Sequence, residues 1–173
     1  MRRALRVLIS TGTAWVGIAL MLTGLLGGCK DDDHDDDVDA GFVTSLATLE
    51  GGKASSTFKV TSLNVGLRLT VENPSSHTKH IYWPTEQRYD FTVHGGGGLV
   101  WNWANGRTFQ DNEGMTTVFP HQTLTYNQSW DMRNNAGSIV SPGTYTVGGT
   151  ITNSLFLGED VPEPPAVTIT IEP

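Results

Sequence analysis

The chain has 173 residues and a formal net charge of −7, and 38% of its residues are hydrophobic. An acidic chain without a cluster of lysines and arginines lacks the electrostatic footprint of nucleic-acid-binding proteins, so no nucleic-acid partner is expected. Its one cysteine excludes a disulfide framework and any zinc site built on paired cysteines, so core burial must supply the stability of the folded part.

The first residues have the pattern of a secretory signal peptide. Three arginines among the first six residues precede an apolar run from Val7 to Leu26, and small residues follow it. The sequence LGGC at residues 26–29 resembles the lipobox of bacterial lipoproteins, in which cleavage before the cysteine is followed by its lipidation. We therefore expect residues 1–28 to be a lipoprotein signal peptide and Cys29 to carry a lipid anchor.

This anchor predicts an exported protein that is held on a membrane of a bacterial cell envelope. Lys30 follows the cysteine at the position where an aspartate would resemble an inner-membrane retention signal, so an outer membrane is favoured if the cell has two membranes. The alternative is a transmembrane helix, because the apolar run is about long enough to span a bilayer. Thr11, Gly12 and Thr13 weaken that alternative.

Residues 29–40 are expected to form a tether that starts at the lipidated cysteine. The sequence DDDHDDDVD at residues 31–39 holds seven carboxylates, which repel one another and predict an extended, disordered segment. A calcium-binding loop would need glycine and glutamate where Ala40 and Leu46 stand. The segment is therefore interpreted as a spacer, with weak, nonspecific cation binding around His34 as the alternative.

Residues 41–173 are expected to form one domain of β-strands. Apolar and polar residues alternate with a period of two, as in Leu67 to Glu72, and Gly, Pro, Asn or Asp residues interrupt the alternation. Turn signals include NPSS at residues 73–76 and SPG at residues 141–143. About eight such segments, without helical periodicity, predict an all-β fold in the form of an antiparallel β-sandwich.

The stretch RYDFTVHGGGGLVWNW at residues 88–103 is interpreted as two core strands joined by a glycine turn. Each segment places large residues on one face, namely Tyr89, Phe91 and Val93 in the first and Leu99, Trp101 and Trp103 in the second. Residues 95–98 supply the turn, because glycine tolerates positive φ. The aromatic rings would pair across strands in the core, and an exposed aromatic platform is the alternative. Trp83 and Phe109 lie next to predicted loops and are expected to be more exposed.

The chain carries no catalytic signature, so an enzyme is not expected. HExxH, GxSxG and P-loop patterns are absent, and residues 95–98 lack the lysine and the spacing of a phosphate-binding loop. His77 and His80 form the closest histidine pair, but residues three apart in a strand point to opposite faces and would converge on a metal only within a loop. No metal site and no cofactor are predicted.

Several motifs of the body occur in a fixed order and at characteristic spacings. They are, in chain order, the strand and turn at residues 67–74, QRYDFTV at 87–93, VWNW at 100–103, Phe109, FPHQTLTY at 119–126, Trp130, and PGTYTV at 142–147. Over about residues 56 to 153 this pattern resembles the BsuPI-type family of intracellular proteinase inhibitors.

The resemblance implies an immunoglobulin-like antiparallel β-sandwich of about seven to eight strands. It also implies an inhibitor whose partner is a subtilisin-like serine protease. The matching residues are mainly core and turn positions with a structural role: Gln87, Arg88, Tyr89, Asp90, Phe91, Trp101, Trp103, Trp130, Gly143 and Tyr145. Ala104 and the pair His121-Gln122 depart from the family pattern. The export signal is a further departure, because the founding inhibitor is intracellular.

The first function that follows is a membrane-tethered inhibitor that blocks a protease cleft with an exposed loop or edge strand. Its candidate loops are residues 110–117 and 132–141, which are polar and contain glycine. The candidate contact residues in these loops are Met115, Thr116, Met132 and Arg133. Either methionine would fill an apolar specificity pocket. The alternative is that both loops are ordinary connections.

The second function is a non-catalytic, immunoglobulin-like module of the cell envelope that binds a protein or a glycan. Trp83 and Phe109 are its candidate anchors, since exposed aromatic side chains dominate many such contacts. Titration against proteases separates the two functions, because only the first predicts inhibition.

Overall fold

The computed structural model describes residues 40–62, 64–153 and 159–173. These residues belong to one structural unit, Asp36–Pro173, and they form strands and turns, which confirms the prediction of an all-β fold. Within these ranges, no helix is long and apolar enough to cross a membrane. The predictions for residues 1–39, which are the signal peptide, the lipidation of Cys29 and the acidic tether, lie outside the described residues.

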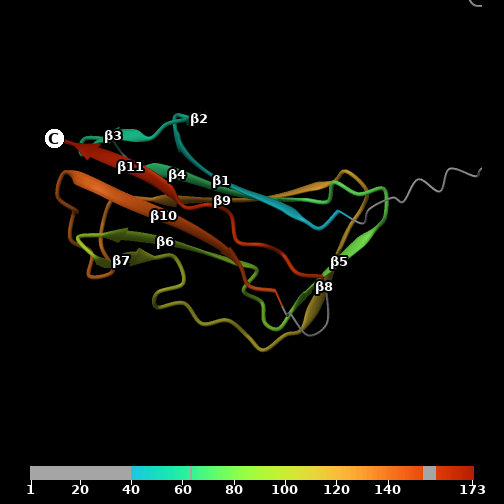
Figure 1. Ribbon diagram of the computed structural model, residues 1–173. Coiled ribbons are helices and arrows are strands. Elements are labelled where there is room, and N and C mark those ends of the chain that lie inside the picture. The colour runs from blue at the N-terminus through green and yellow to red at the C-terminus, as the bar shows by residue number, and fades with distance from the viewer. Residues whose placement is uncertain (1–39, 63, 154–158) are drawn as a thin grey trace, which may run out of the picture. The chain divides into compact units, whose positions relative to one another are not determined.

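One layer of the sandwich is an antiparallel sheet with the strand order β2-β1-β4-β9 (Figure 1). Its strands are β1 (Val43–Glu50), β2 (Lys53–Ala54), β4 (Val65–Glu72) and β9 (Thr123–Trp130). β4 pairs with β1 on one side and with β9 on the other. Its inward residues are each at most 1% exposed: Val65, Leu67, Leu69 and Val71. The alternation that predicted this strand therefore places its apolar residues in the core.

The facing layer is a sheet with the order β3-β11-β10-β6-β7. Its strands are β3 (Thr57–Lys59), β6 (Tyr89–Gly95), β7 (Gly98–Asn102), β10 (Gly143–Ile151) and β11 (Val167–Glu172). Its neighbouring strands are antiparallel, except that β3 runs parallel to β11. The alternation of Phe58 and Val60 predicts an early strand, and β3 contains Phe58, whereas the two-residue strand β2 had no alternation to recognise. The immunoglobulin-like strand topology stays a prediction.

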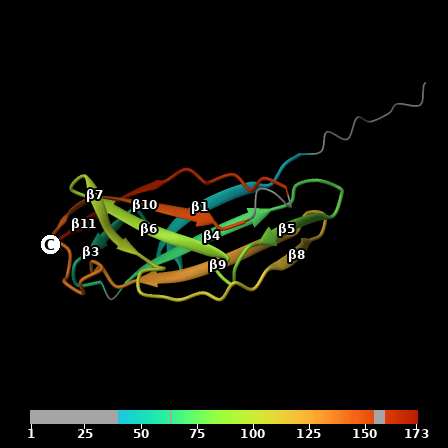
Figure 2. The same ribbon diagram turned by 90° about the horizontal axis from the view of Figure 1, so that it is seen from below.

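A third, two-stranded sheet consists of β5 (Lys79–Trp83) and β8 (Gly114–Val118). It lies at one end of the sandwich (Figures 1 and 2). The core runs between the two main layers and reaches this end, where Ile81 and Val118 are fully buried. Burying each such aliphatic side chain stabilises the fold by about 1.5–3 kcal/mol relative to exposure.

The glycine-rich stretch forms the predicted hairpin of β6 and β7. Gly96 and Gly97 adopt φ values of 60° and 85° at its tip, a conformation that favours glycine. The aromatic rings of both strands pack against the core: Phe91 is fully buried, and Tyr89, Trp101 and Trp103 are partly buried. The interpretation of these rings as core is therefore confirmed, and a freely exposed platform is excluded.

A β-bulge corrects one detail of this hairpin. Val93 pairs with Trp101 and His94 pairs with Leu99, so Val100 is an extra residue without a partner on β6. The bulge moves Leu99 to the outer face beside His94, and Leu99 is 53% exposed. The expectation that Leu99 shares the inner face with Trp101 is wrong, because strict alternation does not survive the inserted residue.

Candidate functional site

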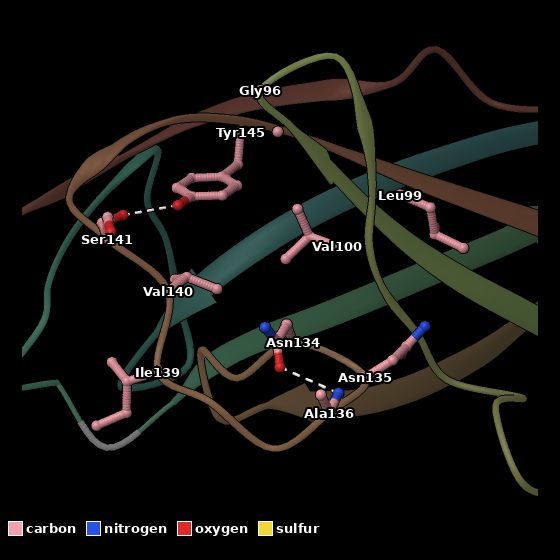
Figure 3. A pocket seen from close by; sticks show the side chains of 11 residues that line it. Gly96, Leu99, Val100, Asn134, Asn135, Ala136, Ile139, Val140, Ser141 and Tyr145 are labelled. Carbon is pink, nitrogen blue, oxygen red and sulfur yellow. Dashed lines mark hydrogen bonds between the residues drawn. The ribbon is translucent and has the colours of Figure 1, made fainter.

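The candidate site lies at the end of the sandwich opposite the β5–β8 sheet. Residues 131–142, hereafter the β9–β10 loop, and the turn at residues 96–97 meet there, because the start of β10 pairs with the end of β6. An open pocket of about 550 Å³ separates the two connections (Figure 3). Val100, Val140 and Tyr145 point into this pocket, so its floor is apolar and continuous with the core.

Two large apolar side chains stand on the rim of this pocket. Leu99 is 53% exposed and Ile139 is 59% exposed. Leu99 belongs to β7, just after the turn, and Ile139 belongs to the β9–β10 loop; Figure 3 shows both pointing away from the pocket interior. Each of these exposed apolar side chains is a candidate contact for a partner.

The tip of the β9–β10 loop is fixed by its own hydrogen bonds. The side-chain oxygen of Asn134 accepts hydrogen bonds from the backbone N–H groups of Ala136 at 3.0 Å and Ser138 at 2.9 Å. The N–H of Gly137 donates to the Asn134 carbonyl at 2.8 Å, and Arg133 Nη1 donates to the Gly137 carbonyl at 2.7 Å. This Asx-turn network holds the tip in one conformation.

The same loop is fastened to the body of the domain. Trp130 Nε1, from the end of β9, donates to the Arg133 carbonyl at 2.8 Å. Asn135 covers the edge of β7 by donating its N–H to the Val100 carbonyl at 3.0 Å. Its side-chain oxygen accepts a hydrogen bond from the N–H of Asn102 at 2.9 Å. The loop is therefore rigid at both its base and its side.

Met132 has a different position from the one expected. It is only 2% exposed, and its φ of 56° lies in the left-handed region, which directs the side chain into the core. The N–H of Val140 donates to its carbonyl at 2.9 Å and closes the base of the loop. The expectation that Met132 fills a protease pocket is wrong. Arg133 is exposed, and its side chain lies 3.6 Å from the carboxylate of Asp131.

The other candidate loop, residues 110–117, is partly a strand. Its second half belongs to β8, where Met115 lies opposite Tyr82 and is 52% exposed. Thr116 is half-buried, and its hydroxyl accepts a hydrogen bond from Trp83 Nε1 at 2.8 Å. Thr116 therefore has a structural contact, and Met115 is the apolar side chain that this segment presents to solvent.

Trp83 is a core residue, so the expectation that it is an exposed anchor is wrong. Its side chain is 1% exposed, and the Arg88 guanidinium lies 5.0 Å from its ring centre. β5 turns its Trp83 face inward, which a sequence position next to a loop did not indicate. Phe109 is partly exposed and lies 5.8 Å from the ring of Trp103, between ring centres. The Arg107 guanidinium also lies against the Trp103 ring, 4.4 Å from its centre.

Asp90 and Arg88 do not form the surface pair that their spacing suggested. Asp90 Oδ1 accepts hydrogen bonds from the N–H groups of Phe91 at 2.8 Å and Ala104 at 3.2 Å. Asp90 Oδ2 accepts one from Asn102 Nδ2 at 2.6 Å. The carboxylate thus holds β6 to the end of β7, while the Arg88 guanidinium lies over the ring of Trp83.

The remaining motif residues form an aromatic and hydrogen-bonded framework. Tyr89 lies 4.6 Å from Trp103 and 4.9 Å from Tyr126 between ring centres. Trp130 lies 6.2 Å from Trp101 and 6.0 Å from Tyr145. The Gln87 carbonyl accepts a hydrogen bond from the Thr152 hydroxyl at 2.5 Å, and Gly143 begins β10. These contacts connect the two layers, which is the structural role expected of the motif.

Burial controls the ionisation of Tyr126 in this framework. Removal from water raises the pKa of its phenol above the ordinary value of 10.0, and the nearby Arg88 charge offsets part of this rise. Elsewhere in the described ranges, no three His, Cys, Asp or Glu side chains gather as a metal site would require. His80 instead lies with its Nδ1 3.3 Å from the Thr117 hydroxyl.

Sequence reasoning missed Ile139, Leu99 and Asn134, the residues that shape the rim and the loop tip. The isoleucine within the mainly polar segment NNAGSIVS at residues 134–141 was an available signal. Polar loop residues do not bury such a side chain, so its exposure to solvent could have been expected. Asn134, three residues before Gly137, was a second signal, since asparagine and glycine at such positions favour tight turns.

Comparisons with solved structures found similar chains at low identity. A β-glucosidase of Erythrobacter marinus is 11% identical with a TM-score of 0.39, over 76% of this chain and 15% of that one. An alkylpurine DNA glycosylase of Pseudomonas fluorescens is 8% identical with a TM-score of 0.44, over 78% and 31%. The CARDB domain of a Pyrococcus furiosus protein is 12% identical with a TM-score of 0.39, over 76% and 94%. This chain therefore spans less than a third of the two enzymes.

A comparison with curated proteins found no match. Among protein families, the model of the BsuPI intracellular proteinase inhibitors matches residues 53–155. The matched range contains β4 to β10, and with them the hairpin, the aromatic framework and the β9–β10 loop. The chain belongs to the BsuPI family of intracellular proteinase inhibitors.

Proposed function

We propose that this protein is a membrane-tethered inhibitor of a subtilisin-like serine protease and that the β9–β10 loop enters the protease cleft. Membership in a family of proteinase inhibitors supports a protease as the partner. The observation that supports this particular loop is a fixed backbone that carries the exposed, apolar side chain of Ile139.

The rigidity of the loop favours binding, because a segment that is ordered before association loses little conformational entropy on association. The Asn134 network fixes the tip, and Trp130 and Asn135 fasten the base and the side. The neighbouring turn at residues 96–97 has no comparable side-chain bonds, since it consists of glycines. The β9–β10 loop is thus the better-ordered of the two connections at this end.

Ile139 supplies the apolar contact. It lies on the returning half of the loop, where it forms an isolated antiparallel bridge with Arg133, so the backbone there is extended. Extended segments suit a protease cleft, which binds its substrates by strand-like pairing. Full burial of an isoleucine side chain in an apolar specificity pocket contributes about 1.5–3 kcal/mol. Leu99 on the pocket rim would cover the neighbouring surface.

Titration of the full chain against a subtilisin-like and a trypsin-like protease tests this proposal. We expect stoichiometric inhibition of the subtilisin-like enzyme. Ile139→Asp should weaken inhibition by roughly 30-fold or more, because it places a charge in an apolar pocket at a central contact. The measured quantity is the inhibition constant of each variant, with circular dichroism confirming that each variant is folded.

Met115→Asp is the matched control, because Met115 is 52% exposed and lies in the other candidate segment at the opposite end. It should leave the inhibition constant unchanged. If Met115→Asp abolishes inhibition and Ile139→Asp does not, the contact segment is β8 and not the β9–β10 loop. Absence of inhibition by the parent chain, or its rapid digestion, would reject the inhibitor function itself.

The tether is the second part of the proposal. Lipidation of Cys29 would hold the inhibitor at the membrane, and the acidic segment at residues 31–39 would keep the domain away from the membrane surface through charge repulsion and extension. This arrangement would place the inhibitor among exported proteases. The support comes from the sequence motifs of residues 1–39.

A further inference from the structure

β9 is the longest edge strand among the described residues. It pairs with β4 along all eight of its residues, and no backbone hydrogen bond joins it to a described residue outside β4. Figure 2 shows β9 at the outer margin of its sheet, with β4 between it and β1. Every second N–H and carbonyl of β9 therefore faces away from the sheet without a backbone partner among the described residues.

The other open sheet edges in the described part of the chain are shorter than β9, or they are covered. β2 and β3 have two and three residues. Asn135 covers the outer edge of β7 through its bonds to Val100 and Asn102. β5 and β8 have five residues each. β9 is thus the longest continuous open edge among the described residues, whereas soluble β-proteins commonly keep such edges short or covered.

β9 carries none of these protections. Its sequence TLTYNQSW contains no charged residue, no proline and no glycine. Its register with β4 is continuous from Val65↔Trp130 to Glu72↔Thr123, so no bulge twists the edge away. A long, regular and uncharged edge is a template for one more strand.

The inward side chains of β9 indicate that the sandwich is open along this edge. Leu124, Tyr126 and Gln128 are only partly buried. Their neighbours on β4, Leu69 and Val71, are fully buried at the same depth. An additional strand beside β9 would remove the exposed parts of Leu124 and Tyr126 from water, which favours its addition.

We propose that β9 pairs antiparallel with β9 of a second copy of this chain. A two-fold axis perpendicular to the sheet keeps inner faces together and joins the two four-stranded sheets into one continuous sheet. The outward side chains of β9 then lie beside the same side chains of the second copy, on one face of the joined sheet. They are Thr123, Thr125, Asn127 and Ser129. These side chains carry no charge, so two copies meet without repulsion, and hydroxyl and amide pairs across strands stabilise such contacts.

The same outer row argues for a copy over a foreign segment. Selection of a foreign strand needs a charged or apolar side chain that discriminates between sequences. The row offers only hydroxyl and amide groups, and the neighbouring Arg68 is already engaged with Asn127, its Nε donating to Oδ1 at 3.2 Å. In the register centred on Tyr126 the copy pairs Thr123 with Ser129 and Thr125 with Asn127. In the register centred on Asn127 it pairs Thr125 with Ser129 and Asn127 with itself.

Disulfide cross-linking of the full chain tests this pairing. Thr125→Cys with Asn127→Cys places thiols on the outer face of β9, within disulfide distance of the partner in both registers. Thr168→Cys with Thr170→Cys is the matched control, because these exposed residues have the same spacing on β11, an interior strand. Both pairs retain Cys29, so its background is shared. We expect a covalent dimer from the β9 pair only.

A charge on the edge should prevent the dimer. Thr123→Lys with Ser129→Lys, added to the β9 cysteine pair, places like charges opposite each other in the register centred on Tyr126 and adds four positive charges along the shared edge in either register, so it should lower the dimer yield by roughly tenfold. Thr144→Lys with Thr146→Lys, on the exposed face of interior strand β10, should not. Equal dimer yields from both cysteine pairs, a yield that the edge lysines leave unchanged, or adducts to a foreign protein would each overturn the proposal.

Discussion

The Asp90 carboxylate accepts three hydrogen bonds from Phe91, Asn102 and Ala104, and Arg88 turns away from it towards the ring of Trp83. These two residues carry opposite charges at a spacing that predicts a surface ion pair. Asp90 instead holds two strands together, because a carboxylate can accept hydrogen bonds from several N–H groups where a strand ends. At the scale of single residues, the family motif therefore supplies side chains that hold neighbouring strands together.

Tyr126 gives a pH-dependent prediction at this scale. Burial raises the pKa of its phenol in the folded state, so the unfolded chain ionises first as pH rises past the ordinary value of 10.0. The stability that neutral Tyr126 contributes is therefore present below that pH and is lost as pH rises through the folded pKa. Unfolding free energies of Tyr126→Phe, measured by denaturant titration, should fall less steeply above about pH 10 than those of the parent. Parallel slopes would contradict the assignment.

The β9–β10 loop gives a prediction at the scale of one element. Asn134→Ala removes the side-chain oxygen that holds Ala136 and Ser138, and the loop must then be ordered during binding. We expect inhibition of the subtilisin-like protease to weaken by roughly tenfold, the effect of about one or two lost hydrogen bonds. Asn105→Ala, in an exposed neighbouring turn, is the control and should leave the inhibition constant unchanged. An equal effect of both substitutions would show that the order of the loop is not what matters.

Prediction of strands from alternation succeeded where a strand pairs without interruption with the strands on both sides of it in the sheet. β4 alternates without interruption and lies between β1 and β9, so its apolar residues are buried as predicted. It failed at the bulge of β7, where the inserted Val100 reverses the direction of Leu99. The expectation that Met132 is an exposed loop residue failed for a different reason, because a left-handed backbone directs its side chain into the core. Neither event changes the local composition, so the sequence carries no signal for it.

The proposed tether gives a prediction for the whole molecule. Because lipidation requires the thiol, Cys29→Ser should leave an unprocessed precursor or release the protein from membranes. Fractionation with mass spectrometry of the N-terminus measures both outcomes. Adding Ser45→Cys to the Cys29→Ser chain is the control, because it restores a cysteine at a different position and should not restore lipidation. A Cys29→Ser protein that still matures and carries an acyl chain would contradict the tether.

The sequence by itself determined the all-β class, the positions of the long strands, the hairpin at residues 88–103 and the family, because these depend on short-range alternation, turn residues and motif order. Only the tertiary structure decided which side chains are presented to solvent. Trp83 and Met132 are buried, and Ile139 and Leu99 are exposed, because the packing of one layer on the other, a bulge and a left-handed residue set their directions. The openness of the β9 edge is likewise a property of strand order, which joins residues far apart in the chain and has no local signature.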